Sequence, residues 1–135
     1  MRTTLITGTN RGIGLEFVRQ YAMGGWWVFA CCRNPVTAEA LNRLAAQYPD
    51  QITIHALDVA NHAQIEQLSQ ALSNQTIDLL INNAGVYPPG QGDTFGKTDY
   101  AAWAYAFEIN TMAPLKMAEA FIQQISGSQL KTIIT

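Results

Sequence analysis

The chain has 135 residues, enough for one domain with a sizeable core, and its 48% hydrophobic content suits strands that are buried on both faces of a sheet. Its net charge of −2 excludes the strongly basic surface of a nucleic-acid-binding protein. No apolar run reaches the ~18 residues of a membrane span, and the start Met1-Arg2-Thr3 lacks a signal-peptide pattern.

Segments of strand and helix character alternate along the whole chain. Apolar runs predict strands near 4–7, 26–31, 52–57, 77–81 and 131–135. Apolar residues at helical spacing predict helices over 13–22, 38–48, 60–73 and 99–125. A loop over 85–98 carries two prolines and four glycines. This order predicts a Rossmann-type, doubly wound α/β fold with three layers, a single domain over residues 1–135 that breaks off within its fifth strand.

A glycine-rich loop follows the first predicted strand and opens the first helix. Gly8, Gly12 and Gly14 are spaced G-x-x-x-G-x-G. We expect Gly8 to take a turn conformation, Gly12 to let the backbone approach a phosphate, and Gly14 to let the helix pack on its strand. Because a helix start presents free N–H groups and the positive end of the helix dipole, the loop predicts a diphosphate site.

Other interpretations of this loop are a tight structural turn and a different nucleotide motif. The loop does not follow the usual dinucleotide pattern G-x-G-x-x-G, and no lysine follows its second glycine as a Walker A loop requires. We therefore exclude an NTPase. The strand before the loop and the helix after it favour a βαβ nucleotide site over a simple turn.

The remaining reactive side chains suggest no second chemistry. Cys31 and Cys32 are neighbours in one strand, so they face opposite ways and are expected to be reduced thiols of a cytoplasmic protein. His55 lies within a strand and is expected to be structural, and His62 lies near a helix start. No His, Cys, Asp or Glu cluster has metal-ligand spacing, so no metal is expected.

Four separated motifs resemble those of the short-chain dehydrogenase/reductase family, of the classical type. Residues 7–14 match the family's TGxxxGIG motif, and residues 82–85 match its NNAG motif. Asp58-Val59 match the pair after the third strand, beginning with an acidic residue, that contacts adenine in the family. Asn110 falls at the position of the family's catalytic Asn. The resemblance covers all 135 residues as the N-terminal part of such a domain, and residues 7–21 are most similar to carbonyl-reductase and C-factor-like members.

The resemblance implies a set of site residues, with a catalytic role for Asn110. The implied cofactor-binding residues are Gly8, Thr9, Asn10, Arg11, Gly12, Ile13, Gly14, Arg33, Asp58, Val59, Asn82, Ala84 and Gly85. Structural alternatives remain open: Asp58 or Asn61 can cap the following helix, Asn83 can stabilise a turn, and Asn110 can bend its helix.

The end of the second strand indicates the cofactor. Sites for NAD usually place an acidic residue there to bind the ribose 2′-hydroxyl, but this strand ends Cys31-Cys32-Arg33. The guanidinium of Arg33 suits a 2′-phosphate, and Arg11 lies in the glycine loop. Either arginine alone can be a solvated surface charge, but in the family basic residues at both places imply NADP(H).

The implied function is an NADP(H)-dependent oxidoreductase that moves a hydride between nicotinamide and a carbonyl or alcohol substrate. The sequence contains no Tyr-x-x-x-Lys pair, so the 135-residue chain is expected to be inactive alone and to come from a longer enzyme. One alternative is a chain that ends at Thr135, which would leave the fifth strand and the long helix uncovered. The other is a partner chain that covers this surface. As a function, the alternative is a non-catalytic NADP(H)-binding module or sensor.

The expected partner is a small carbonyl or alcohol compound, with no nucleic acid and no membrane. A substrate contact is expected from Tyr87, Pro88 or Pro89, which follow the NNAG motif. The helix over 99–125 is a possible homo-oligomer surface, and Trp103, Phe107 and Met117 within it are expected to serve packing.

Overall fold

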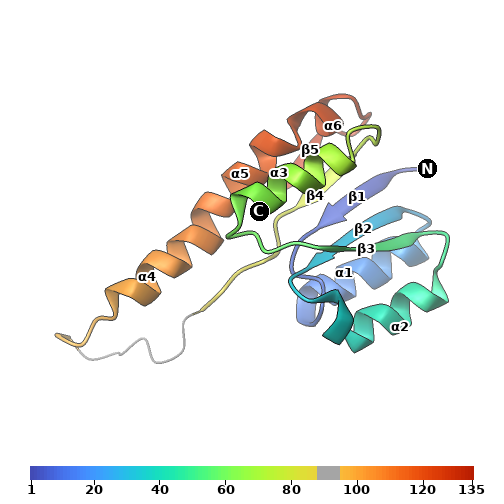
Figure 1. The fold of residues 1–135 in the computed structure, drawn as a ribbon. Coiled ribbons are helices and arrows are strands. Elements are labelled where there is room, and N and C mark those ends of the chain that lie inside the picture. The colour runs from blue at the N-terminus through green and yellow to red at the C-terminus, as the bar shows by residue number, and fades with distance from the viewer. Residues whose placement is uncertain (88–94) are drawn as a thin grey trace.

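A computed structural model describes residues 1–87 and 95–135 of the chain. A parallel five-stranded sheet forms its centre, with the strands in the order β3-β2-β1-β4-β5 (Figure 1). The strands are β1 (Thr3–Ile6), β2 (Trp27–Cys32), β3 (Ile52–Ala56), β4 (Leu79–Ile81) and β5 (Thr132–Ile134). The predicted doubly wound α/β fold is thereby confirmed.

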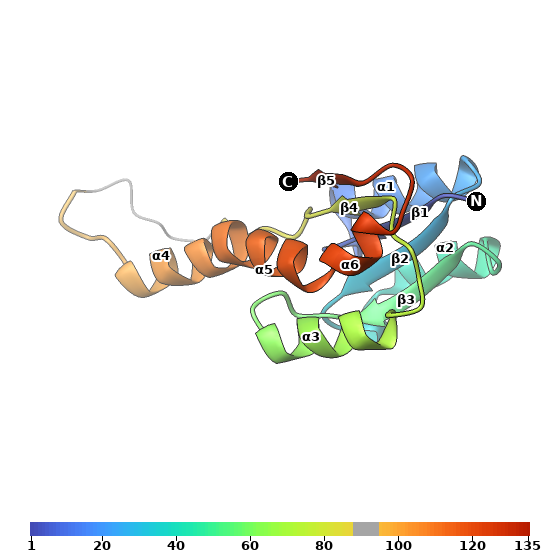
Figure 2. The same cartoon turned by 90° about the horizontal axis from the view of Figure 1, so that it is seen from above.

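The helices occupy the segments between the strands. They are α1 (Gly12–Met23), α2 (Glu39–Gln47), α3 (His62–Ala71), α4 (Tyr100–Phe107), the π-helical turn η2 (Glu108–Met112), α5 (Ala113–Ala120) and α6 (Ile122–Ser126). A short 3₁₀ turn, η1 (Pro35–Thr37), follows β2. Helices α1 and α2 lie on one face of the sheet, and α3, α5 and α6 lie on the other (Figures 1 and 2).

Two hydrophobic cores fill the space between the three layers. Successive strand residues point to opposite faces, so Leu5 joins the core under α3 and α5 while its neighbour Ile6 joins the core under α1 and α2. Cys31 and Cys32 are divided in the same way and are both free thiols. This arrangement explains why the strands read as continuous apolar runs.

The strand order reverses beside β1. The chain moves outward from β1 through β2 to β3 and then returns to β4 on the other side of β1. The loops after β1 and β4 therefore leave the same end of the sheet in opposite directions and open a crevice, which is where such sheets bind ligands.

The helix predicted over 99–125 is interrupted twice. The π-helical turn η2 separates α4 from α5, and the backbone at Phe121 separates α5 from α6. Pro114 explains part of this, because it has no N–H for the ladder and favours the first turn of a new helix. Met117 is fully buried as expected, whereas Trp103 and Phe107 are exposed and pack against each other edge-on outside the two cores.

Candidate functional site

The crevice holds a cavity of about 430 Å³ at the carboxyl ends of the strands. Its walls come from the loop after β1, the end of β2, the loop after β3, the turn after β4, and the helix α4 with η2. The lining residues are Gly8, Asn10, Arg11, Gly12, Ile13, Gly14, Cys32, Arg33, Leu57, Asp58, Val59, Asn83, Ala84, Gly85, Val86, Tyr105 and Ile109.

The three glycines of the loop meet different steric requirements. Gly8 and Gly12 have φ of 67° and 57°, in the left-handed region that favours glycine. Space beside Gly12 is open, with nothing within 4 Å of an added Cβ. An added Cβ at Gly14 would lie 2.1 Å from the carbonyl oxygen of Gly8, so only glycine lets α1 start this close to the loop.

The first turn of α1 offers free backbone donors to the cavity. Its N-cap residue, Arg11, makes no side-chain cap. Leu15 is the first residue whose N–H bonds back into the loop, to the carbonyl of Arg11. Among the described residues, the N–H groups of Gly12, Ile13 and Gly14 have no backbone acceptor, so the start of α1 is suited to an anion.

Polar side chains tie the glycine loop to the turn after β4. The Asn83 Nδ2 donates to the carbonyls of Thr7 and Gly8 at 3.1 and 3.0 Å. The Thr7 hydroxyl accepts the N–H of Ala84 at 2.9 Å. These contacts favour the structural interpretation of Asn83 that the sequence left open, and they show a role for Thr7 that the sequence analysis missed.

The helix cap that the sequence left open is Asn61. Its side chain accepts the N–H of Gln64 at the start of α3. Asp58 has a local role, since its Oδ1 accepts the N–H of Ala60 while its own N–H donates to the Gln64 side chain at 2.7 Å. This leaves the second carboxylate oxygen of Asp58 as an acceptor on the wall of the cavity.

Two arginines give the rim of the cavity positive charge. The ion pairs found within residues 1–87 and 95–135 join Arg19 to Glu16 and Lys116 to Glu66, so Arg11 and Arg33 have no acidic partner there. Next to Arg33, burial raises the pKa of the Cys32 thiol, so it stays protonated near neutral pH and is not a nucleophile.

Most predicted binding residues meet at this cavity, with two exceptions. Thr9 is fully buried, and both its N–H and its hydroxyl bond to the carbonyl of Cys31. Asn82 also lies outside the lining, and its backbone N–H donates to the carbonyl of Ile134 in β5. Beyond the motifs, the lining residues are Cys32, Leu57, Val86, Tyr105 and Ile109, and Asn83 of the NNAG motif lines the cavity without having been proposed for binding.

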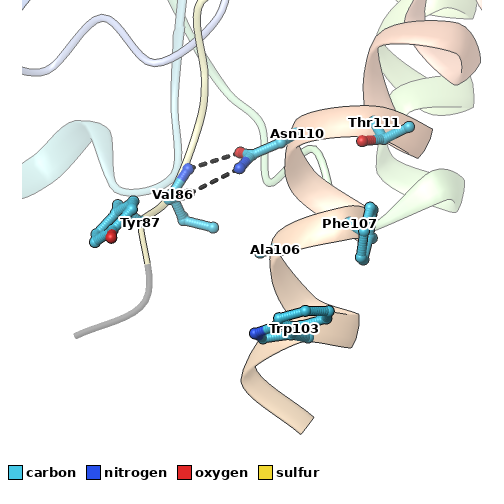
Figure 3. A pocket seen from close by; sticks show the side chains of 7 residues that line it. All are labelled: Val86, Tyr87, Trp103, Ala106, Phe107, Asn110 and Thr111. Carbon is cyan, nitrogen blue, oxygen red and sulfur yellow. Dashed lines mark hydrogen bonds between the residues drawn. The ribbon is translucent and has the colours of Figure 1, made fainter. Parts of the chain in front are cut away.

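A second cavity of about 410 Å³ lies beside the first one and contains Asn110 (Figure 3). It is lined by Val86, Tyr87, Trp103, Ala106, Phe107, Asn110 and Thr111. The Asn110 Oδ1 accepts the N–H of Val86 and its Nδ2 donates to the carbonyl of Val86, both at 2.8 Å. Since both ends of the amide are occupied, Asn110 fixes the backbone of Val86, which lines both cavities. Pro88 and Pro89 fall outside the described residues.

Histidines and metal-ligating groups form no further site among the described residues. No group of His, Cys, Asp and Glu suited to a metal ion occurs in the described part of the chain. His55 bonds to the Thr53 hydroxyl at 3.0 Å and packs edge-on against Phe29, in keeping with its expected structural role. Among the described residues, no helix has the length and apolar character to cross a bilayer.

Comparisons with known proteins agree with this geometry. A family model described as short chain dehydrogenase matches residues 2–135. The (+)-neomenthol dehydrogenase of Arabidopsis thaliana is 30% identical, over 98% of this chain and 52% of that protein. Protein FixR of Bradyrhizobium diazoefficiens is 27% identical, over 94% of this chain and 47% of its own length. The chain spans about half the length of these curated relatives.

Solved structures show the same similarity. The NADPH-bound carbonyl reductase from chicken fatty liver superposes with a TM-score of 0.81 and 34% identity, over 93% of this chain and 52% of that one. A carbonyl reductase from Pseudomonas aeruginosa PAO1 in complex with NADP gives a TM-score of 0.85 and 33% identity, over 92% of this chain and 56% of that one.

Proposed function

Because this chain belongs to the short-chain dehydrogenase family, we propose that it binds NADP(H) and forms the cofactor-binding part of an oxidoreductase that acts on a carbonyl or alcohol substrate. The observation that carries the proposal is the free first turn of α1, which faces a cavity whose rim holds Arg11 and Arg33. NADPH and NADP in the two carbonyl reductases that resemble this chain support the same cofactor.

The residues of the cavity fit the diphosphate of a dinucleotide. The open space beside Gly12 admits a phosphate close to the backbone. The N–H groups of Ile13 and Gly14 are the donors we propose for it, because they lie in the first turn of α1 and have no backbone acceptor among the described residues.

The charges on the walls suit the adenosine half of the dinucleotide, which carries both the adenine and the 2′-phosphate. We assign the 2′-phosphate to Arg33 and Arg11, since both residues line the cavity without an acidic partner in the described chain. The adenine end is assigned to Asp58 and Val59, with the unused carboxylate oxygen of Asp58 as the acceptor for the amino group.

The bound cofactor would supply or accept the hydride. The chain's own residues hold the turn at which the substrate meets the cofactor: Asn110 fixes the main chain of Val86 between the two cavities. We therefore propose that Asn110 positions this turn and that the substrate enters the second cavity, past Tyr87.

Four exposed apolar residues, Tyr100, Trp103, Phe107 and Leu115, support an additional role of α4 and α5 in self-association.

The 135-residue chain has no Tyr-x-x-x-Lys pair to deliver the proton, so we propose that it binds NADPH without oxidising it. A non-catalytic NADP(H)-binding module predicts the same result for this chain, and the two functions separate only in a protein that carries the remaining catalytic groups. The two free buried thiols, Cys31 and Cys32, support a reducing, cytoplasmic setting.

Titration calorimetry with NADP⁺ and NAD⁺ tests the proposal, with Arg33→Asp as the variant. The substitution should weaken the binding of NADP⁺ by about 1–3 kcal/mol, through loss of a charge-assisted contact, and change the binding of NAD⁺ little. Arg43→Asp, on α2 and outside the cavity lining, is the matched control. Equal losses for both cofactors would contradict the 2′-phosphate assignment, and no binding of either cofactor to the unmodified chain would refute the site.

A further inference from the structure

Tyr105 is an aromatic side chain on the wall of the cofactor cavity that no motif contains. It lies on α4, four residues before Ile109, so both residues fall on one face of the helix. Both line the cavity together with Leu57, Asp58 and Val59 from the loop after β3. Helix and loop therefore both contribute walls to the same cavity.

The apolar residues of these walls differ in how exposed they are. Leu57, Val59 and Ile109 are buried members of the core under α3 and α5. Tyr105 is 40% exposed, so its ring lies at the mouth and not in the core. The exposed part of such a ring is an apolar surface on which a second flat ring can stack.

The other aromatic residues of α4 are arranged differently. Trp103 packs edge-on between Tyr100 and Phe107, with ring centroids 6.2 and 6.5 Å away. Trp103 and Phe107 line the second cavity, on successive turns of the helix (Figure 3). Tyr105 is thus the aromatic residue that α4 contributes to the cofactor cavity within the described chain.

We infer that Tyr105 packs its ring on one face of the adenine base, opposite Val59, while Asp58 accepts a hydrogen bond at the polar edge of the base. This inference rests on the proposed function, because it places the adenine end at the loop after β3. It adds a binding residue from a distant helix to a site that the motifs restrict to the strand ends. The contact uses the ring, so the phenol hydroxyl is not required.

Calorimetric titration with NADP⁺ and with 2′,5′-ADP, which carries the adenine end alone, tests the inference. Tyr105→Ala should weaken the binding of both ligands about tenfold, or about 1.4 kcal/mol, as expected for loss of base stacking. Tyr105→Phe should bind both ligands like the unmodified chain. Tyr100→Ala is the matched control, because Tyr100 is on the same helix and outside the cavity lining.

The possible results separate the inference from the proposed function. Failure of the unmodified chain to bind either ligand would refute the proposed function and the inference with it. Tight binding that is unchanged in Tyr105→Ala, or weakened equally in Tyr100→Ala, would overturn the role of Tyr105 alone. If Tyr105→Ala does not fold, nuclear Overhauser contacts between adenine protons and the Tyr105 ring decide the question in the unmodified chain, and their absence overturns the contact.

Discussion

Alanine substitutions of three glycines separate backbone strain from close packing at the nucleotide site. Gly25 and Gly12 have φ of 82° and 57°, and neither has an atom within 4 Å of an added Cβ. Gly14 has no such strain, but its Cβ would lie 2.1 Å from the Gly8 oxygen and 2.5 Å from the Asn83 amide nitrogen. Gly25→Ala therefore tests backbone strain alone, Gly12→Ala tests strain beside the cavity, and Gly14→Ala tests steric overlap.

The expected losses of stability follow from these distances. Gly25→Ala and Gly12→Ala should each lower the free energy of unfolding by about 1–2 kcal/mol, the cost of a left-handed non-glycine residue. Gly14→Ala places a carbon about 1 Å inside the 3.0 Å limit of real contacts. Because the atoms that must yield are a backbone carbonyl and an amide that holds two carbonyls, we expect about 3 kcal/mol, the upper end for overpacking.

Urea unfolding and calorimetric titration with NADP⁺ together provide the assay. Gly25→Ala should bind NADP⁺ normally, since Gly25 follows α1 at the far end from the loop. Gly12→Ala should bind more than tenfold more weakly despite its modest loss of stability, because its methyl group enters the space proposed for a phosphate. Equal loss of stability in Gly14→Ala and Gly25→Ala would show that the contact with the Gly8 carbonyl does not limit packing and would refute this reasoning.

Three further substitutions test the supports of the site. Asn83→Ala should lower the free energy of unfolding by about 1–3 kcal/mol, because it leaves the Thr7 and Gly8 carbonyls without this donor; an unchanged urea midpoint would contradict this. Asn110→Ala should increase amide exchange at Val86, measured by NMR, and unchanged exchange would mean that the turn holds without it. Burial lowers the pKa of His55, so the folded state binds its proton more weakly than the unfolded chain and stability should fall as the pH drops below about 6.5. His55→Asn should reduce that fall, as followed by thermal unfolding; an identical pH profile would assign the fall to other groups.

The sequence predicted the sheet and its helices because their signals are local. Continuous apolar runs such as 28–32 supply both cores at once, and the periodicity of Ile65 and Leu68 fixes the buried side of α3. The interruption at η2 had a weaker signal, the alternative that Asn110 bends its helix. The π-helical turn over Glu108–Met112 accompanies a tertiary contact that the sequence does not show, the pairing of Asn110 with Val86.

Most lining residues of the first cavity that belong to motifs could be predicted from the sequence, and those outside the motifs could not. The glycines, Arg33 and Asp58 belong to loops at strand ends, so topology alone gathers them. Thr9 belongs to the glycine-loop motif, yet its side chain is buried in the interior, where its hydroxyl donates to the carbonyl of Cys31. Tyr105 comes from a helix distant in sequence, and no spacing rule indicates that it lines the same cavity as Asp58.

The residue shared by the two cavities is anchored through its main chain. Val86 faces both compartments, and its N–H and carbonyl are both occupied by one amide on η2. A replacement at this position alters the bulk of the wall while the backbone that carries it stays anchored. Sequence change at residue 86 is thus free to alter the shape of the shared wall while the main chain at this position keeps a constant geometry.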